Sequence, residues 1–303
     1  NDAKKPLFNR AISGLYPSGS TIKPIIATAA LEEKTISPSK KINDIGYIEI
    51  KNKYDPNIVY RRHGIQPHGW VDMRQAIAVS SNIYFYTVGG GYKDQAGLGP
   101  TRIKKYLELF GWGSKTRIDL PGEADGFIPS PEWKKQVKKE IWWDGDTYNM
   151  SIGQGDILTT PIQMASSFAA IANGGTLYKP QVVKEIVNEN KDVVEEIKPE
   201  IMNSDFVEPN SLKVVREGMR MAVTAEDAPH ASSYSLNFLP VSAAAKTGTA
   251  ETPGKNVYHN WITVFAPYDN PEIVLTVMLE NVPGVQAAAL PVARDILQWY
   301  FTK

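Results

Sequence analysis

Three short motifs carry the residue types of a nucleophilic catalytic site. They are Ser20-Thr21-Ile22-Lys23, Ser80-Ser81-Asn82 and Lys246-Thr247-Gly248-Thr249. Each motif is short enough to arise by chance, and the chain repeats two of the patterns, at 37–40 and at 235–237. The surrounding residues must therefore decide which copies can take part in chemistry.

Ser20 stands where a loop, Pro17-Ser18-Gly19, meets a predicted helix. Free backbone N–H groups and the helix dipole favour developing negative charge at such a junction. Lys23 lies three residues further on and shares a helical face with Ser20, so we expect its amine to reach the Ser20 hydroxyl. A lysine acts as a base when burial and a second cation lower its pKa, and Lys246 is the expected second cation. The pattern predicts Ser20 as nucleophile and Lys23 as base; the alternative is an N-cap serine beside a surface lysine.

The second motif follows a helical run at 75–79 and precedes an aromatic segment at 83–86. The hydroxyl of Ser80 and the carboxamide of Asn82 are two residues apart, so both can point into one cleft. We expect Ser80 to relay protons and Asn82 to bind a substrate amide. The alternative is a helix cap without a role in chemistry.

The third motif lies between small residues, directly before a predicted hairpin. Gly248 has no side chain, so an extended substrate could approach the strand edge and pair with its backbone. The ammonium of Lys246 and the hydroxyls of Thr247 and Thr249 would then hold a carboxylate. A simple tight turn is the alternative, but it gives no reason for a lysine inside a small, apolar run.

The elements around these motifs indicate a mixed fold. The pattern predicts a mostly buried helix at 21–34, a loop and hairpin at 38–70, further helices at 71–79, 102–110, 161–172 and 211–223, strands at 257–266 and 272–280, and a last helix at 287–300. We therefore expect an α/β (α+β) fold, with an antiparallel sheet flanked by helices plus an all-helical lobe. Residues 36–236 would form the mainly helical lobe with its loops, and 1–35 plus 237–303 the helix-sheet lobe.

Composition narrows the classes of function. The 303 residues include 33 basic and 33 acidic side chains, so net charge gives no attraction to nucleic acid. The absence of cysteine excludes disulfides, thiolate catalysis and cysteine-bound zinc. Because the chain starts at Asn1 without an initiator Met or a signal-type apolar region, we expect an excised fragment whose membrane anchor and N-terminal pedestal lie upstream.

The three motifs are part of a longer resemblance to the penicillin-binding proteins, specifically the elongation-type class B members called penicillin-binding protein 2. S-x-x-K, S-D-N and K-T-G form the motif set of active-serine penicillin-binding proteins and β-lactamases. The resemblance covers nearly the whole chain, with ordered matches at 6–12, 16–21, 121–123, 145–147, 151–155, 160–165, 171–175, 245–251, 260–261 and 266–267. The stretch 151–175 also separates this family from secreted β-lactamases.

This resemblance implies the fold of penicillin-binding proteins and serine β-lactamases and the activity of a peptidoglycan D,D-transpeptidase. Ser20 would attack the penultimate D-Ala carbonyl of a stem peptide that ends in D-Ala-D-Ala, and Lys23 would be the acylation base. The second motif would line the cleft, and the third would bind the terminal carboxylate. The backbone N–H groups of Ser20 and Thr249 would form the oxyanion hole. β-Lactam antibiotics would acylate the same serine.

The resemblance also implies where such a protein works and with what. It implies a location at the outer, periplasmic face of the bacterial cytoplasmic membrane, with a membrane glycosyltransferase and scaffold proteins of the elongation complex as partners, and no cofactor. Some relatives bind a structural zinc after the first motif, and Asp44, Asp55, His63 and His68 lie in that region. Their spacing is loose and no cysteine completes the set, so we expect solvated loop residues and no metal site.

Three features depart from the family pattern. Two strands that normally precede residues 8–10 are absent, so the sheet is expected to be incomplete or completed from outside this chain. Ser81 stands where some relatives carry Asp or Cys, and Ala244 where Gly is common. Two alternatives stay open: a β-lactamase, although no E-x-x-L-N pattern follows Ser80, and a non-catalytic penicillin sensor or interaction module that keeps Ser20.

Overall fold

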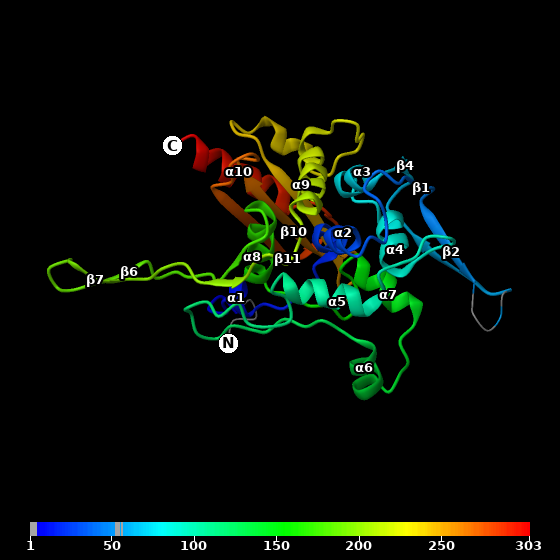
Figure 1. Cartoon of the computed structure of the whole chain (residues 1–303), viewed down its shortest axis with the longest axis horizontal. Coiled ribbons are helices and arrows are strands. Elements are labelled where there is room, and N and C mark those ends of the chain that lie inside the picture. Colours follow the sequence, from blue (N-terminus) through cyan, green and yellow to red (C-terminus); the bar gives the residue numbers. More distant parts are fainter. Residues whose placement is uncertain (1–4, 52–54, 56) are drawn as a thin grey trace.

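The computed structural model describes residues 5–51, 55 and 57–303; positions 52–54 and 56 of the expected loop and hairpin lie outside the described residues. Helices surround a small sheet, and one long two-stranded ribbon projects from the body (Figure 1). The described residues contain no helix that is both long and apolar enough to cross a bilayer.

A three-stranded antiparallel sheet carries the third motif. Its strands are β9 (Ala244–Glu251), β10 (Val257–Ala266) and β11 (Ile273–Pro283), in the order β11-β10-β9. β10 and β11 form the predicted hairpin, and Lys246 of β9 lies opposite Thr263 of β10. β9 is therefore an edge of this sheet, and its outer side is open to other elements.

Side-chain alternation along β10 gives the sheet two apolar faces. Ile262 and Val264 pack in one cluster with α10 (Ala289–Phe301), whereas Phe265 belongs to the main core together with α8 (Pro161–Ala172). Because successive strand side chains point to opposite faces, α8 and α10 cover opposite sides of the sheet. Both helices were predicted from the sequence, and both are confirmed.

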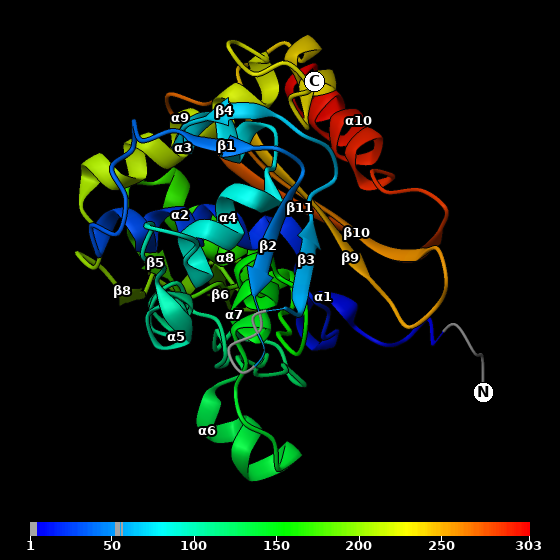
Figure 2. The ribbon, with the colours of Figure 1, turned by 90° about the vertical axis from the view of Figure 1, so that its right-hand side faces the viewer.

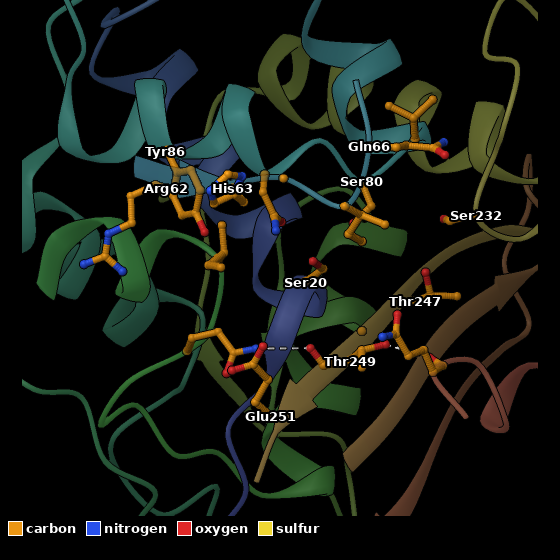
Figure 3. Close-up of a pocket in the computed structure, with 18 of the residues that line it drawn as sticks. Ser20, Arg62, His63, Gln66, Ser80, Tyr86, Ser232, Thr247, Thr249 and Glu251 are labelled. Carbon is orange, nitrogen blue, oxygen red and sulfur yellow. Dashed lines mark hydrogen bonds between the residues drawn. The ribbon is translucent and has the colours of Figure 1, made fainter. Parts of the chain in front are cut away.

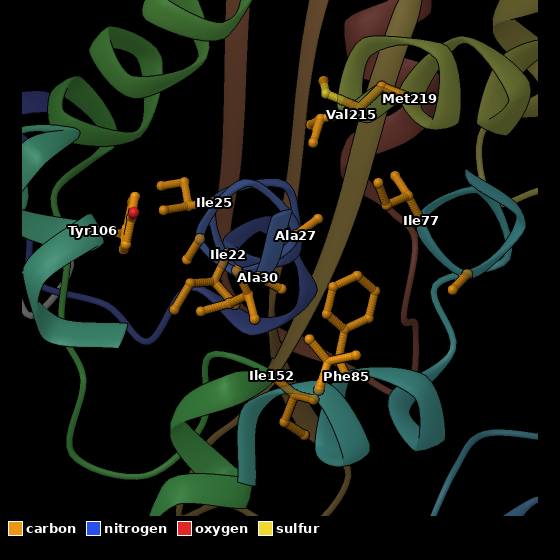
Figure 4. Packing of buried hydrophobic residues seen from close by; sticks show 14 of the residues in the cluster. Ile22, Ile25, Ala27, Ala30, Ile77, Phe85, Tyr106, Ile152, Val215 and Met219 are labelled. Atoms are coloured by element: carbon orange, nitrogen blue, oxygen red, sulfur yellow. The ribbon is translucent and has the colours of Figure 1, made fainter. Parts of the chain in front are cut away.

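The helix that follows the first motif forms the centre of the main core. A 3₁₀ turn, η1 (Gly19–Ile22), leads directly into α2 (Lys23–Glu32), and every residue from Lys23 to Ala30 is buried. α2 is in contact with α3 (Met73–Ala78), α4 (Asn82–Gly90), α5 (Gly99–Leu109) and α9 (Pro209–Thr224). Figure 4 shows the side chains that close around it, among them Ile77, Phe85, Tyr106, Val215 and Met219. A helix that is apolar on nearly all sides can only be buried. Its packing therefore fixes the preceding turn η1, which contains Ser20.

The lobe expected to be helical also contains four two-stranded antiparallel ribbons between residues 42 and 203, one of them in the segment where a hairpin was expected. They pair β1 (Ile42–Asp44) with β4 (Gly69–Val71), β2 (Tyr47–Lys51) with β3 (Val59–His63), β5 (Leu177–Tyr178) with β8 (Ile201–Asn203), and β6 (Glu185–Val187) with β7 (Val193–Glu196). These strands have two to five residues, which is too short for a clear alternating pattern. In β6 and β7 every residue is exposed, so neither face needs apolar side chains.

Several helices were not predicted. They are α1 (Arg10–Ser13), α4, α6 (Pro131–Trp133) with the π-helical turn Lys134–Lys138, and α7 (Asp144–Ser151). In α4 seven successive residues from Ile83 to Gly89 are buried, so the segment shows no amphipathic periodicity. The division into lobes at residues 36 and 236 stays a prediction. Figure 2 shows α8 and α9, which belong to the expected helical lobe, lying beside the sheet strands.

Candidate active site

Ser20 lies on a turn that is wedged between two other backbone segments. Gly19 has a φ of +53°, and a Cβ there would lie 2.5 Å from the backbone oxygen of Thr249 on β9. On the other side, the N–H of Gly19 donates to the carbonyl of Gly153 at 2.9 Å. The positive φ and the close approach of Thr249 need a glycine at position 19, so this residue allows the nucleophile turn to touch the sheet edge.

Lys23 is fully buried, and the hydrogen bonds of its amine go to the second motif and not to the predicted partner, Ser20. Its amine donates to the Ser80 carbonyl at 2.7 Å and to Oδ1 of Asn82 at 2.7 Å, and it lies 3.2 Å from Oγ of Ser80. Among the described residues no hydrogen bond joins the Lys23 amine to the Ser20 hydroxyl. The reason is local: Lys23 is the first residue of α2, and its side chain points toward the turn before α4, so it connects the first and second motifs.

Ser80 links the second motif to the third. Its backbone is in the left-handed region, with a φ of +59°, at the turn between α3 and α4. The ammonium of Lys246 donates to Oγ of Ser80 at 2.8 Å and to the Thr247 carbonyl at 3.0 Å. A hydroxyl has two lone pairs and one proton. Oγ of Ser80 can therefore lie between both lysines and still pass a proton on.

Burial lowers the pKa of both lysines. The pKa of Lys23 falls well below its ordinary value because the amine is desolvated and because Lys246 is close, an effect that Asp44 partly offsets. Desolvation lowers the pKa of Lys246 to about 7. The predicted arrangement of a buried lysine beside a second cation is thus present, and burial favours the neutral form of both amines.

Asp44 is buried behind the second motif, which corrects the expectation that it is a solvated loop residue. Its Oδ2 accepts hydrogen bonds from Oγ of Ser81 at 2.5 Å and from Nδ1 of His68 at 2.8 Å, and its Oδ1 accepts from the N–H of Gly46 at 2.9 Å. Burial works to raise the pKa of Asp44, but these hydrogen bonds outweigh it and hold the pKa below its usual value. Ser81 is also the N-cap of α4 and accepts from the N–H of Tyr84.

The four zinc-ligand candidates do not form a metal site. Asp44 and His68 bond to each other, and the described part of the chain holds no group of three or more acidic, histidine or cysteine side chains that could bind a metal ion. A direct hydrogen-bond cluster joins Asp44, His68 and Ser81, and this cluster anchors the turn that presents Ser80 and Asn82.

A groove with a volume of about 850 Å³ contains the nucleophile. It is lined by predicted residues from all three motifs, namely Ser20, Ser80, Asn82, Thr247, Gly248 and Thr249. Figure 3 shows Ser20 in the middle of this groove, with Thr247 and Ser232 on one side and Tyr86 and Arg62 on the other. Lys23 and Lys246 are fully buried and are not part of the lining. The ammonium of Lys246 therefore acts on the groove indirectly, through its hydrogen bonds to Ser80 and Thr247.

Gly248 also has a structural role that the sequence did not predict. A Cβ at this position would lie 2.8 Å from the backbone oxygen of Ser18 and 3.1 Å from the backbone nitrogen of Thr21. The missing side chain thus lets β9 pack against the nucleophile turn. Substrate pairing along β9 remains a prediction. The next predicted residue, Thr249, donates a hydrogen bond from its hydroxyl to the Gln286 carbonyl at 2.6 Å.

The groove lining also includes residues that were not among the predicted site residues, among them Arg62, Tyr86, Asn149, Gln154 and Glu251. Gln154 donates to the Thr249 carbonyl at 3.3 Å, so the segment after α7 also holds the third motif. Glu251 could have been found from the sequence, because it follows Thr247 and Thr249 at a spacing of two. For Arg62 and Asn149 no sequence signal existed, since the fold alone brings their strand and helix together.

Comparison with known proteins identifies this arrangement. A family model of the penicillin-binding protein transpeptidase domain matches residues 1–298. The chain belongs to this family. The penicillin-binding protein resemblance and the fold class expected from the motifs are thereby confirmed.

Two curated relatives of the transpeptidase family carry the same description, peptidoglycan D,D-transpeptidase MrdA. The protein of Haemophilus influenzae is 33% identical over 320 aligned residues, which cover 100% of this chain and 47% of that protein. The protein of Escherichia coli K12 is 30% identical, with 98% of this chain and 47% of that protein covered. The chain thus spans about half the length of the curated relatives it matches.

Solved structures of penicillin-binding protein 2 share the fold. The structure of Pseudomonas aeruginosa PBP2 in complex with WCK 5153 has a TM-score of 0.82 at 31% identity and covers 99% of this chain and 64% of that one. Helicobacter pylori PBP2, in a complex with MreC, has a TM-score of 0.80 at 28% identity and covers 100% of this chain and 52% of that one.

Proposed function

We propose that this chain is a peptidoglycan D,D-transpeptidase domain in which Ser20 forms an acyl-enzyme with stem peptides. One observation carries this proposal: Lys23 and Lys246 both contact Oγ of Ser80, at the wall of the groove that holds Ser20. A chain of proton-carrying groups beside a serine that lines a groove is the arrangement that acyl transfer needs.

Acylation forms one bond and breaks another. Oγ of Ser20 bonds to the carbonyl carbon of the penultimate D-Ala, and the peptide C–N bond to the terminal D-Ala breaks. The proton of the Ser20 hydroxyl passes through Oγ of Ser80 to the amine of Lys23, and then returns by the same hydroxyl to the leaving amine of D-Ala. The relay through Ser80 accounts for a lysine base that has no direct contact with its nucleophile.

Transfer to the acceptor reverses these steps. The amine of a second stem peptide attacks the ester carbon, the bond to Oγ of Ser20 breaks, and the amine proton restores the hydroxyl. Asn82 uses its Oδ1 on Lys23, so its NH₂ group is left to donate to a substrate carbonyl. The backbone N–H groups of Ser20 and Thr249 would stabilise the oxyanion. Thr247, with Lys246 behind it, would hold the terminal carboxylate together with Thr249, whose hydroxyl would turn from the Gln286 carbonyl to the substrate.

A β-lactamase of the same fold is the alternative, and the residues that line the groove do not favour it. Fast deacylation requires a carboxylate or similar base that activates water. Among the described residues that line the groove, Glu251 is the single acidic side chain, and it lies two residues beyond Thr249 on β9. The position fits peptide binding better than activation of a water at the Ser20 ester.

The test is incubation with benzylpenicillin, followed by intact mass over time. We expect one adduct that persists for hours and is absent in Ser20→Ala. Loss of the adduct within seconds would favour a β-lactamase. A folded protein that forms no adduct would favour a penicillin sensor that has lost its chemistry, and would contradict the proposal.

Partners and location are proposed from the relatives. The H. pylori PBP2 structure contains MreC, and another PBP2-like structure is described as a peptidoglycan synthase complex that coordinates polymerization and crosslinking. We infer that the whole protein works with an elongation scaffold protein and a membrane glycosyltransferase, at the outer face of the cytoplasmic membrane. Co-purification of the full-length protein with these two classes of partner tests this inference.

A further inference from the structure

The ribbon of β6 and β7 projects from the body and buries none of its side chains. Every residue from 182 to 196 is exposed (Figure 1). An isolated two-stranded hairpin is only marginally stable in water, so such a ribbon needs support at its ends. Both carboxylate oxygens of Asp119 accept from the N–H groups of residues 182–183, at 2.8 and 2.9 Å, and Oδ1 of Asn188 accepts from the N–H of Asp192 at 2.9 Å. The chain thus holds in place a surface that does not serve the core.

One face of this ribbon combines a carboxylate pair with an apolar pair. Glu185 lies directly opposite Glu196, and Val187 lies directly opposite Val193. Alternate residues of β6 point to the same face, and paired residues share it, so these four side chains lie together. Like charges directly opposite each other destabilise a strand pair. Within the described residues neither carboxylate has a hydrogen bond or an ion pair, so a positively charged group placed beside them would remove this repulsion.

The outer edge of β6 offers backbone groups to another strand. Among the described strands, β6 pairs with β7 alone. The Lys184 carbonyl and the Asn188 N–H both bond to the returning strand, at 2.9 and 3.0 Å. Because the direction of backbone groups alternates along a strand, the N–H and C=O groups of Glu185 and Val187 turn outward. The open edge and the carboxylate–valine face therefore meet at the same two residues.

We propose that this ribbon is a docking arm for a basic, extended segment of a partner protein, which adds to β6 as an antiparallel third strand. A segment with a lysine or arginine two residues from an apolar side chain matches Glu185 and Val187 in register, because both patterns repeat every second residue. Charge supports a basic partner: from Glu185 to Glu196 five side chains are acidic and one is basic. The same charge disfavours nucleic acid or an anionic membrane as the occupant. The inference goes beyond the proposed transpeptidase function and does not depend on it.

The experiment measures binding of a fluorescein-labelled peptide, Thr-Lys-Thr-Val-Thr-Lys-Thr, to the chain by fluorescence anisotropy. Two matched peptides separate charge from strand pairing. One has glutamate in place of both lysines. The other has N-methylvaline in place of valine, which keeps every side chain and removes one backbone N–H. We expect the basic peptide to bind with a Kd about tenfold lower than that of either control, since each control removes one part of the match.

Variants and hydrogen exchange place the peptide on the ribbon. Glu185→Lys should raise the Kd of the basic peptide about tenfold. Glu189→Lys is the matched control, because it makes the same charge change in the turn beyond β6, and its Kd should stay that of the unaltered chain. Bound peptide should slow amide exchange at Glu185 and Val187, whose N–H groups turn outward. Both variants should keep the rate of Ser20 acylation by benzylpenicillin, which also shows that they fold.

Three results would overturn the inference. The first is that the basic peptide does not bind. The second is equal binding of the N-methylvaline peptide, because attraction would then need no strand pairing. The third is an equal loss in Glu185→Lys and Glu189→Lys, which would indicate a general effect of negative charge. None of these results bears on the penicillin adduct of Ser20, so the docking arm and the proposed function fail independently.

Discussion

Lys23 and Lys246 are fully buried, and their amines contact the same atom, Oγ of Ser80, at 3.2 and 2.8 Å. Two ammonium groups this close cannot both stay protonated at little cost. The pKa of Lys23, lowered first by burial and then by Lys246, falls well below its ordinary value, and burial lowers that of Lys246 to about 7. The pair therefore favours one neutral amine beside one cation.

The first prediction is a bell-shaped pH dependence of Ser20 acylation by benzylpenicillin. The rate should rise with pH as Lys23, whose pKa is lowered, loses its proton and becomes a base, and should fall above a pH of about 7, as Lys246 loses the charge that attracts the carboxylate. Rates of adduct formation from pH 5 to 10 measure both limbs. In Lys246→Arg the cation persists, so the falling limb should disappear. A rate that keeps rising to pH 10 would contradict the lowered pKa values.

The second prediction concerns stability, measured as the free energy of unfolding in urea. Lys246 has a pKa of about 7 when folded and about 10.5 when unfolded. Between these values the unfolded chain binds more protons, so the free energy of unfolding should rise with pH relative to Lys246→Met, by at most about 1.4 kcal/mol per pH unit. Below pH 7 both states are protonated and the difference should be flat. A difference that is flat from pH 7 to 10 as well would show that the folded pKa is ordinary.

The sequence was sufficient for the motifs but not for their contacts. Ser20, Ser80 and the third motif line one groove as expected, because each has turn or helix-start chemistry that local sequence reveals. The hydrogen-bond partners of Lys23 were not predicted, since spacing along one helix points only to Ser20, and tertiary packing brings Ser80 and Asn82 within 3.2 Å of its amine.

The same limit explains the fold errors. α8 was predicted with its bounds, because Thr160 suits an N-cap before Pro161 at the first helical position and the run 173–175 is a strong stop; the structure has Thr160 as the N-cap. α4 was missed because a fully buried helix has no polar face to give a period. Asp44 was expected in solvent, because its burial depends on His68 and Ser81, which lie 24 and 37 residues further along the chain.

The third prediction tests the contact between the sheet edge and the nucleophile turn. Gly248→Ala places a methyl group 2.8 Å from the Ser18 carbonyl oxygen, and backbone cannot yield as a side chain can. We expect a loss of about 1–3 kcal/mol in stability and slower acylation of Ser20, because β9 must move away from the turn. Gly254→Ala is the control: its nearest contact is the Val257 side chain at 3.1 Å, away from Ser20, and its acylation rate should be unchanged. Equal acylation rates in both variants would contradict the assigned role.

The fourth prediction concerns the buried carboxylate of Asp44. Asp44→Asn weakens the charge-assisted bonds from Ser81 and His68, so we expect a loss of about 2 kcal/mol in stability and a slower acylation of Ser20, because the turn that presents Ser80 and Asn82 loosens. Ser81→Ala should have a similar effect, and the double variant should lose less than the sum, since both changes break the same bond. Asp156→Asn, which removes an exposed ion pair with Lys138, is the control and should cost less than about 1 kcal/mol.

The pH dependence of that loss has a definite sign. The pKa of Asp44 is lowered on folding, so its contribution to stability is present at neutral pH and disappears as the pH falls through the lowered value. Urea unfolding of Asp44→Asn and the unaltered chain should therefore differ most near pH 7 and converge in acid. If the two curves stayed parallel down to low pH, the stabilising group would not be the ionised carboxylate, and the hydrogen-bond cluster would have to hold the turn as a neutral network.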